Sequence, residues 1–209
     1  YMDTKILKRT LKIKKILPII VVFFSFFILT NCSAQTINKT TDSKETAVPI
    51  KIQGVDNFYK VSETLFRSAQ PTETGMKNIE SFGIGTVISL RSKQKDTELA
   101  KNTELNLIHV SMRAWNPKYE DAVKVMYLLN PNNPDTNRKP ILIHCYHGAD
   151  RTGMMVALYR MVYQNWEREK ALNEMLNGGY GYHSMWKDIV TFIKTVDIEQ
   201  LRKDSQIVN

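Results

Sequence analysis

From residue 52 onward, the apolar positions of the chain alternate between a spacing typical of strands and a spacing typical of helices. Short continuous apolar runs predict buried strands, and apolar residues three or four positions apart predict helices. The expected strands are 58–61, 65–66, 86–90, 107–110 and 141–143. The expected helices are 71–82, 116–129, 152–163, 167–176 and 186–196. Strands that alternate with helices predict an α/β fold with a small, mostly parallel central sheet flanked by helices.

Particular residues mark some of the expected boundaries. The first two strands are close enough in sequence to form a hairpin. Pro71 and Thr72 open the first expected helix and Gly83 follows it, an arrangement typical of helix ends. Asn116 and Pro117 predict the start of the second helix, with Asn116 as its cap and Pro117 in its first turn.

The first 31 residues differ from the rest of the chain. Six basic residues (lysine or arginine) and a single aspartate precede an apolar stretch at 16–29. A basic region followed by a short apolar stretch is the layout of a secretory signal, and this stretch is short for a membrane-spanning helix. We therefore expect export to the periplasm or the outer surface.

The end of that stretch leaves three kinds of processing open. The segment from Leu29 to Gln35 resembles a bacterial lipoprotein signal, in which Cys32 would carry the lipid. Cleavage after Ala34 and an uncleaved anchor are the alternatives. Each alternative places the domain outside the cytoplasm, and a membrane is expected as a partner only through an N-terminal anchor. The polar residues 32–51 predict a flexible tether, and residues 52–205 a single folded domain.

Composition and charge narrow the class of protein. A chain of 209 residues, 43% of them hydrophobic, is long and apolar enough for one folded domain. The net charge of +8 would favour a nucleic-acid partner, but +5 of it comes from residues 1–31 and only +3 from the remainder. We therefore expect a monomer that binds no nucleic acid. The two cysteines, Cys32 and Cys145, lie far apart and exclude a disulfide framework.

One loop carries the candidate chemistry. It reads His144-Cys145-Tyr146-His147-Gly148-Ala149-Asp150-Arg151-Thr152-Gly153 and lies between the strand 141–143 and the almost wholly apolar helix 152–163. A cysteine at the end of a strand faces the N–H groups and the positive dipole end of the following helix, and Arg151 adds a positive charge. These groups favour the thiolate over the thiol, so Cys145 is the candidate nucleophile.

The same loop can hold a phosphate group. Its backbone can curl into a cradle whose N–H groups point inward, and Gly148 permits a close approach of the backbone. The planar fork of Arg151 can bind two phosphate oxygens, and the hydroxyl of Thr152 can donate to the sulfur as it leaves. His144 is expected to support the thiolate. The residues expected to bind the phosphate are Tyr146, His147, Gly148, Ala149 and Thr152.

This loop resembles the His-Cys-x5-Arg-Ser/Thr-Gly signature of the cysteine-dependent protein tyrosine phosphatases. The flanking His, the Gly at the third loop position and the Thr-Gly ending make the match specific. Residues 65–71 and 87–91 resemble the early part of compact bacterial and fungal relatives of the dual-specificity phosphatases. The resemblance implies that Cys145 attacks the phosphorus to give a cysteinyl-phosphate, that Arg151 binds the phosphate, and that water then releases it. It implies neither a metal nor a cofactor.

The general acid of that family is missing from its usual place. The family's aspartate would fall at 112–117, where this chain has no carboxylate. Asp150 is one replacement, because it precedes Arg151 as in the Cys-x-x-Gly-x-Asp-Arg loop of myotubularin-type lipid phosphatases. Glu120 or Asp121, in the first turn of the following helix, is the other. A structural interpretation of Asp150 also stays open, in which it pairs with a neighbouring base or orients Arg151.

Several other residues have two interpretations. Arg67 and Arg91 stand at strand ends, where they either line an anionic pocket or form structural ion pairs. His109 is expected in the core or at a strand end. Three aromatic residues close to a glycine-rich stretch either shape a pocket wall or belong to the core: Tyr180, Tyr182 and Trp186.

Together these features predict an exported phosphatase whose partner is a phosphorylated protein or a small phosphomonoester. Protein phosphotyrosine, with or without phosphoserine and phosphothreonine, is the leading substrate. A phosphoinositide or inositol phosphate is the alternative, suggested by Asp150, Arg151 and His147. The missing loop aspartate suggests a catalytically weak phosphate-binding pseudo-phosphatase as a second class. The Arg-Thr-Gly ending argues against a sulfurtransferase.

Overall fold

A computed structural model of the chain describes residues 46–133 and 139–206. The predictions made for the signal segment, for lipidation of Cys32 and for most of the tether lie outside these residues. Within the two described ranges, no helix is both long and apolar enough to cross a membrane.

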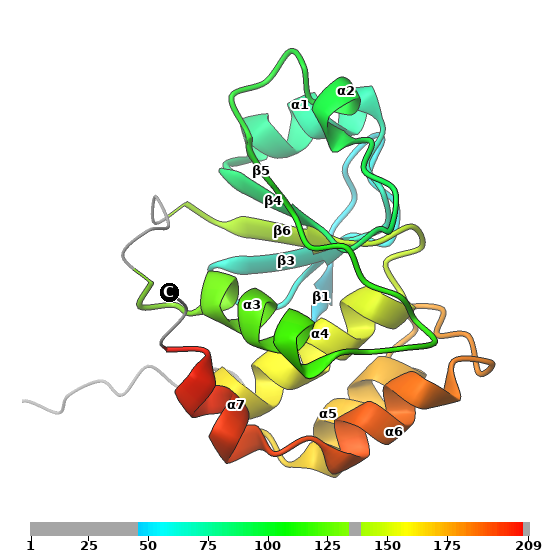
Figure 1. Cartoon of the computed structure of the whole chain (residues 1–209). Helices are drawn as coiled ribbons and strands as arrows, with labels where there is room; N and C mark the ends of the chain where they lie inside the picture. The colour runs from blue at the N-terminus through cyan, green and yellow to red at the C-terminus, as the bar shows by residue number, and fades with distance from the viewer. Residues whose placement is uncertain (1–45, 134–138, 207–209) are drawn as a thin grey trace, which may run out of the picture. The chain divides into compact units, whose positions relative to one another are not determined.

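A six-stranded sheet forms the centre of the domain (Figure 1). Its strands follow the spatial order β1-β2-β3-β6-β4-β5. The neighbouring strands β3, β6, β4 and β5 are parallel, whereas β2 pairs antiparallel with both β1 and β3. The mostly parallel sheet and the hairpin predicted from the sequence are therefore confirmed. The strands are β1 (Val48–Pro49), β2 (Tyr59–Lys60), β3 (Leu65–Ser68), β4 (Thr86–Ser89), β5 (Asn106–His109) and β6 (Ile141–His144).

Helices cover both faces of the sheet, α1 and α2 on one side and α3 to α7 on the other, as Figure 1 shows. Helix α4 is buried along nearly its whole length, because α3, α5, α6 and α7 all pack against it. This explains the almost continuous apolar sequence of that segment. The helices are α1 (Glu73–Phe82), α2 (Asp96–Leu99), α3 (Tyr119–Leu129), α4 (Asp150–Tyr163), α5 (Arg168–Asn177), α6 (Lys187–Thr195) and α7 (Ile198–Asp204).

Strand β6 shows how the sheet separates two apolar cores. Ile141 and Ile143 belong to the larger core around α4, whereas Leu142 belongs to the smaller core beneath α1. Successive side chains of a strand point to opposite faces, so a strand covered on both faces is apolar at every position. The uninterrupted apolar run therefore places β6 in the middle of the sheet, and its carboxyl end leads directly into the candidate loop.

Some boundaries differ from those predicted. Helix α1 ends at Phe82, before Gly83, as predicted, but it begins at Glu73, with Thr72 as its cap rather than within it. Helix α3, however, begins at Tyr119, and Asn116 does not cap it. The N–H of Asn116 instead donates to the carbonyl oxygen of Arg113 at 3.3 Å, within a tight turn that precedes the helix.

The folded domain begins before its predicted limit, and it contains one helix that was not predicted within it. Val48 and Pro49 were assigned to the tether but form β1, which pairs with β2. The N–H of Ala47 donates to Oε1 of Glu174 at 2.9 Å, so this segment is fixed to α5 as well. Helix α7, which carries the chain to Asp204, was not predicted.

Candidate active site

The segment from Cys145 to Arg151, called the cysteine loop below, joins β6 to α4. Cys145 is buried and directly follows the last residue of β6. Helix α4 has Ala149 at its cap position, with no side-chain hydrogen bond to the first turn. The N–H groups of the first helical turn have no acceptors within the helix, so an alanine cap leaves them available to an anion. The cysteine and this end of the helix therefore meet in one loop.

Gly148 places the cysteine loop against the end of β3. Its φ is 71°, in the left-handed region that favours glycine. A Cβ atom at this position would lie 2.4 Å from the carbonyl carbon and oxygen of Ser68, so no side chain fits there. The N–H of Gln70 also donates to the carbonyl oxygen of Tyr146 at 3.1 Å. The path of the loop is therefore fixed by backbone contacts with the segment after β3.

Arg151 is held by the ends of two strands. Its Nη1 donates to the carbonyl oxygens of Leu90, at 3.3 Å, and Met112, at 3.5 Å. Both bonds use the same nitrogen, so among the described residues the Nε and Nη2 groups are left for a ligand. That edge of a guanidinium matches two oxygens of a phosphate. The phosphate-binding role of Arg151 stays a prediction, and this edge of its side chain is the part that would carry it out.

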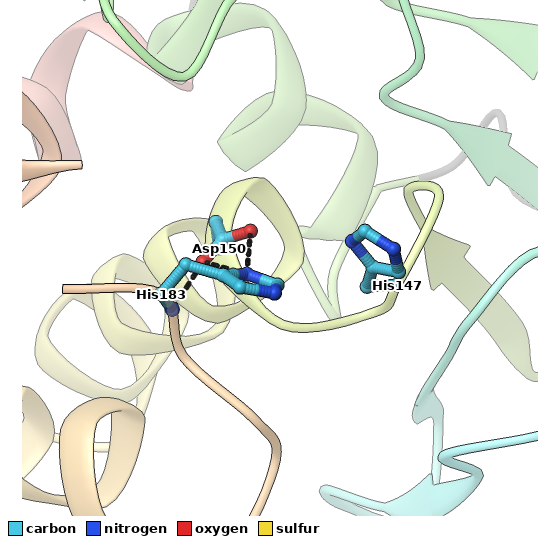
Figure 2. Close-up of side chains that lie close together, drawn as sticks. All are labelled: His147, Asp150 and His183. Atoms are coloured by element: carbon cyan, nitrogen blue, oxygen red, sulfur yellow. Dashed lines mark hydrogen bonds and ion pairs between the residues drawn. The ribbon is translucent and has the colours of Figure 1, made fainter. Parts of the chain in front are cut away.

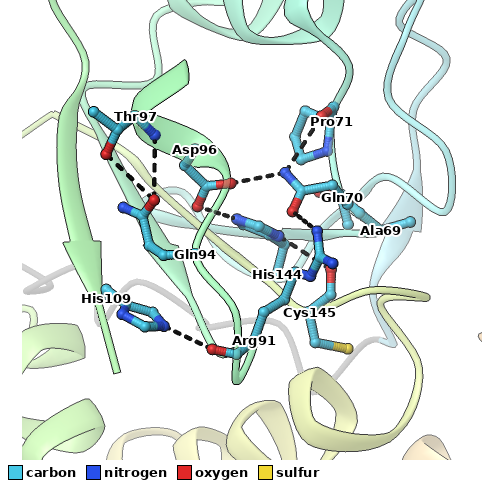
Figure 3. A network of polar contacts seen from close by, with 11 residues as sticks. Ala69, Gln70, Pro71, Arg91, Gln94, Asp96, Thr97, His109, His144 and Cys145 are labelled. Atoms are coloured by element: carbon cyan, nitrogen blue, oxygen red, sulfur yellow. Dashed lines mark hydrogen bonds and ion pairs between the residues drawn. The ribbon is translucent and has the colours of Figure 1, made fainter. Parts of the chain in front are cut away.

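A buried polar network lies behind Cys145 (Figure 3). Nδ1 of His144 lies 3.1 Å from the carbonyl oxygen of Cys145, and Nε2 lies 3.0 Å from Oδ2 of Asp96. Nε2 of Gln70 donates to Oδ1 of Asp96 at 2.8 Å, and Nη1 of Arg91 donates to Oε1 of Gln70 at 2.7 Å. Burial opposes ionisation of Asp96, but the hydrogen bonds from His144 and Gln70 outweigh it and hold the pKa of Asp96 below its usual value.

The hydrogen-bonding pattern fixes the position of His144. Arg91 can only donate, so it fixes the amide orientation of Gln70, and Asp96 accepts hydrogen bonds as a carboxylate. Both ring nitrogens of His144 face oxygen atoms, one on the backbone of Cys145 and one on Asp96. The ring therefore joins the backbone of the nucleophile to a buried carboxylate.

Arg67 of β3 lies beneath the cysteine loop and is wholly buried. Its Nη2 donates to the carbonyl oxygen of Gly148 at 2.7 Å, and its guanidinium lies 3.8 Å from the ring centre of Tyr180. Burial lowers the pKa of Arg67 to about 10, while the charges of nearby groups, Tyr180 first and Glu174 next, raise it in part. Arg67 therefore neither lines the phosphate cradle nor forms an ion pair among the described residues. It fixes the loop to the segment after α5.

Asp150 pairs with a histidine that the sequence did not single out (Figure 2). Its Oδ1 accepts the backbone N–H of His183 at 2.9 Å, and its Oδ2 lies 2.9 Å from Nδ1 of the same residue. The Asp150 side chain is 8% exposed and that of His183 is 43% exposed. Pairing with a neighbouring base, one interpretation of Asp150 from the sequence, is what the structure shows. Its catalytic role stays a prediction.

The other two acid candidates lie in the first turn of α3. Glu120 is exposed and Asp121 is partly buried. Burial raises the pKa of Asp121 above its ordinary value. The charge of Lys118 lowers this pKa in part, and smaller effects of Glu120 and Lys124 oppose each other. Asp121 thus remains a candidate on electrostatic grounds.

The remaining predicted residues lie around the cysteine loop. The Thr152 hydroxyl is buried with no hydrogen-bond partner among the described residues, so it is available to a sulfur or a ligand. The Tyr146 ring is 54% exposed and lies 5.1 Å from the guanidinium of Arg91. Nε2 of His109 lies 2.6 Å from the carbonyl oxygen of Arg91, which is a strand-end position as expected. His147 is exposed on the rim of the loop.

The aromatic residues after α5 were predicted either to shape a pocket wall or to belong to the core. Tyr180 is buried and belongs to the larger core. The hydroxyl of Tyr182 donates to the carbonyl oxygen of Trp186 at 2.7 Å, and the Trp186 ring lies 6.0 Å from that of Trp115. Trp115 is 56% exposed and follows Met112, which holds Arg151, by three positions. An exposed tryptophan therefore belongs to the segment that contacts the site.

Comparisons with known proteins agree with this geometry. A family model described as "DSP-PTPase phosphatase fused to NAD+ Kinase" matches residues 46–190. The dual specificity protein phosphatase TpbA of Pseudomonas aeruginosa is 33% identical over 164 residues, which cover 76% of this chain and 73% of TpbA. The inositol diphosphatase DSP3 of Arabidopsis thaliana is 28% identical over 159 residues, which cover 70% of this chain and 73% of DSP3.

A solved structure is similar as well. The crystal structure of P. aeruginosa TpbA with its cysteine replaced by serine, in complex with pTyr, has a TM-score of 0.68 and 27% identity, and the match covers 80% of this chain and 100% of that one. The family match spans the cysteine loop and the strands and helices that build it, from before β2 into α6. This chain therefore belongs to the DSP-PTPase family of cysteine-dependent tyrosine and dual-specificity phosphatases.

Proposed function

We propose that this phosphatase hydrolyses phosphomonoesters through a cysteinyl-phosphate on Cys145. One observation carries the proposal: Cys145, the open end of α4 and the free edge of Arg151 belong to one loop whose path is fixed by Gly148. The Cys145 sulfur forms a bond to phosphorus as the bond from phosphorus to the leaving oxygen breaks. Water then forms a bond to phosphorus, the phosphorus–sulfur bond breaks, and the thiolate and inorganic phosphate are released.

Charges around the loop support both steps. The buried ring of His144 lies directly behind Cys145, between two oxygen atoms, and in its protonated form it stabilises the thiolate before attack and after release. Arg151 and the first N–H groups of α4 stabilise the negative charge on the phosphoryl oxygens in the transition state. These donors are fixed before substrate arrives, so little reorganisation is needed during the reaction.

Asp150 supplies the proton that the leaving oxygen requires. It is the first residue of α4, adjacent to Arg151, and His183 holds its carboxylate in place through two groups. The Asp150–His183 pair can give up one proton to the leaving oxygen and take one back from the attacking water. The usual loop position at 112–117 contains no carboxylate that could do this instead.

Protein phosphotyrosine is the substrate that the exposed aromatic side chains around the cysteine loop suit best. The Tyr146 ring on the loop and the Trp115 ring on the neighbouring segment are exposed, and flat apolar surfaces of this kind suit an aryl phosphate. The relative TpbA has been crystallised with pTyr, which supports the same substrate here. The relative DSP3, an inositol diphosphatase, favours a polyphosphorylated inositol as the alternative. Asp150, however, places a carboxylate in the loop, and this would repel additional phosphate groups.

Export remains part of the proposal. It is supported by the basic and apolar pattern of residues 1–31, and lipid attachment at Cys32 by the sequence around it. Expression of the full chain in a bacterium grown with a labelled fatty acid tests both. Label in the wild type that is lost in Cys32→Ala supports lipidation, and retention of the protein in the cytoplasm contradicts export.

Turnover of an aryl phosphate by the full chain, purified in a mild detergent, tests the reaction itself. We expect hydrolysis in the presence of EDTA, inhibition by vanadate, and loss of activity in Cys145→Ser. The same protein is then given phosphotyrosine, phosphoserine and phosphothreonine peptides and inositol polyphosphates. Faster release of phosphate from phosphotyrosine peptides supports the proposed substrate, and preference for the inositols overturns it. No turnover of any ester overturns the enzyme and leaves a phosphate-binding protein.

A further inference from the structure

Two histidines and an aspartate converge at the rim of the cysteine loop (Figure 2). His147, Asp150 and His183 each offer one ligand atom, and these three atoms all lie within 4.8 Å of one another. The rings of His147 and His183 have their centres 5.0 Å apart. The two histidines are exposed, so an ion can reach the group from solvent, whereas Asp150 is buried beneath them.

Two separate clamps fix the segments that carry these ligands. Nδ2 of Asn57 lies 2.8 Å from the carbonyl oxygen of His147 and 2.9 Å from that of Tyr180, so one amide joins both segments. Arg67 joins them again, since it donates to the carbonyl oxygen of Gly148 and packs on the Tyr180 ring. The backbone positions of His147 and His183 are therefore set before any ion binds, which lowers the cost of assembling a site.

The donor set has the chemistry of a zinc site. Two imidazole nitrogens and one carboxylate oxygen are ligands that Zn²⁺ prefers, and three protein ligands leave a fourth position open. In a tetrahedral site with ordinary zinc distances, ligand atoms lie about 3.3 Å apart. The 2.9 Å contact between Asp150 and His183 must therefore open slightly, and the exposed His147 ring must turn inward.

We propose that His147, Asp150 and His183 bind a Zn²⁺ ion that inhibits the phosphatase. The ion occupies the carboxylate of Asp150 and replaces its contact with Nδ1 of His183, so Asp150 is no longer available to donate a proton to the leaving oxygen. Inhibition rests on the proposed function, because it requires Asp150 to act as the acid. Binding of the ion does not depend on that function and is measured separately.

Metal binding is tested on the full chain carrying Cys145→Ser, which removes the thiolate as a competing ligand. Zn²⁺ is titrated by calorimetry, and Co²⁺ is added as a spectroscopic probe of tetrahedral coordination. We expect one ion per chain, and weaker binding by on the order of tenfold or more when His147→Gln or His183→Gln is added. His109→Gln is the matched control, because this histidine lies outside the group and contacts the carbonyl oxygen of Arg91. Thermal unfolding of each variant shows that it is folded.

Inhibition is then measured on chains that retain Cys145. Zn²⁺ is added to the wild type and to each histidine variant, and each rate is compared with that variant's own rate in EDTA. We expect the wild type and His109→Gln to be inhibited at similar concentrations, and the other two variants to need about tenfold more Zn²⁺ or higher. Unchanged binding in His147→Gln and His183→Gln, or binding that disappears with Cys145→Ser, overturns the site. Saturation of the site without loss of activity overturns the inhibition, whereas an inactive chain that still binds Zn²⁺ overturns only the proposed function.

Discussion

Nε2 of His144 lies 3.0 Å from a carboxylate oxygen of Asp96, and the two side chains are 0% and 2% exposed. This contact ties the residue before the nucleophile to helix α2, which is 48 positions earlier in the sequence. A hydrogen bond from His144 to this carboxylate places a proton on Nε2. Asp96 does not belong to the phosphatase signature, but its negative charge stabilises a positive charge on His144.

Replacing Asp96 with asparagine is expected to weaken the thiolate without removing any catalytic group. The asparagine amide can donate to Nε2, and the carboxylate that would stabilise a positive charge on His144 is removed. Loss of about 1.4 kcal/mol of stabilisation lowers the fraction of thiolate by about tenfold. We therefore expect Asp96→Asn to be alkylated at Cys145 by iodoacetamide about tenfold more slowly near neutral pH. Glu98→Gln, on the exposed face of the same helix, is the control, and equal alkylation rates in all three proteins would contradict the assignment.

The same carboxylate makes the stability of the protein depend on pH. The pKa of Asp96 in the folded protein lies below its ordinary value of 3.8, because hydrogen bonds from His144 and Gln70 outweigh the effect of burial. A depressed pKa stabilises the fold above the unfolded value, and the stabilisation is lost as the pH falls through the folded value. Urea unfolding of the wild type and Asp96→Asn should thus give a larger difference in unfolding free energy at about pH 7 than at about pH 3. A difference that grows on acidification would mean that Asp96 is not ionised in the fold.

The spacing of apolar residues predicted most of the fold, because the residues at those positions are the ones buried in the two cores. The run Ile141-Leu142-Ile143 divides its side chains between two cores, and this indicates a central strand without any knowledge of its neighbours. Strand β1 could not be predicted in the same way, because its two residues are exposed and are held by pairing with β2. Asn116 was assigned to a helix cap, but it lies in a local turn with Arg113, and α3 begins only at Tyr119.

Some residues of the candidate site could be predicted from the sequence and others could not. Cys145, Gly148 and Arg151 could be predicted because the chemistry of the loop is contained in one short segment. His183 could not, because it lies 33 positions from Asp150 in a segment without periodic spacing. Asp96 was missed for the same reason. Both residues act on the loop across the fold, so only the three-dimensional structure relates them to it.

Gly148→Ala is expected to abolish most activity while leaving the rest of the fold intact. The added Cβ would lie 2.4 Å from the backbone of Ser68, and the loop must move to relieve this contact. A displacement of about 1 Å in a catalytic loop costs about 10²-fold in rate, so kcat/KM for an aryl phosphate should fall by about that factor. Gly179→Ala is a matched control: its φ is also positive, at 82°, but nothing lies within 4 Å of the added atom. If the two variants lose activity equally, the contact between the added Cβ and Ser68 does not explain the loss at Gly148.

Glu174→Gln is expected to be among the most destabilising single changes in the domain. Its carboxylate accepts hydrogen bonds from Nε and Nη2 of Arg160 at 2.9 and 2.8 Å, and from the N–H of Ala47. Removing the charge leaves the wholly buried guanidinium of Arg160 without its ionic partner, at a cost of about 3–5 kcal/mol in unfolding free energy. Glu199→Gln, which removes an exposed ion pair with Arg202, should cost about 1 kcal/mol or less. Denaturant unfolding measures both, and equal costs would mean that the Arg160 pair is solvated.

The dependence of rate on the leaving group identifies the general acid. A group that donates a proton matters most for esters of weakly acidic alcohols and phenols, and contributes about 10²–10⁴-fold there. Asp150→Asn should lower kcat for a phosphotyrosine peptide by that factor, and should affect an ester of a strongly acidic phenol far less. Asp121→Asn and Glu120→Gln are the matched variants on α3, and both should retain the leaving-group dependence of the wild type. If Asp121→Asn instead loses the reaction with poor leaving groups while Asp150→Asn keeps it, the acid lies on α3, and the pairing of Asp150 with His183 serves only to position the loop.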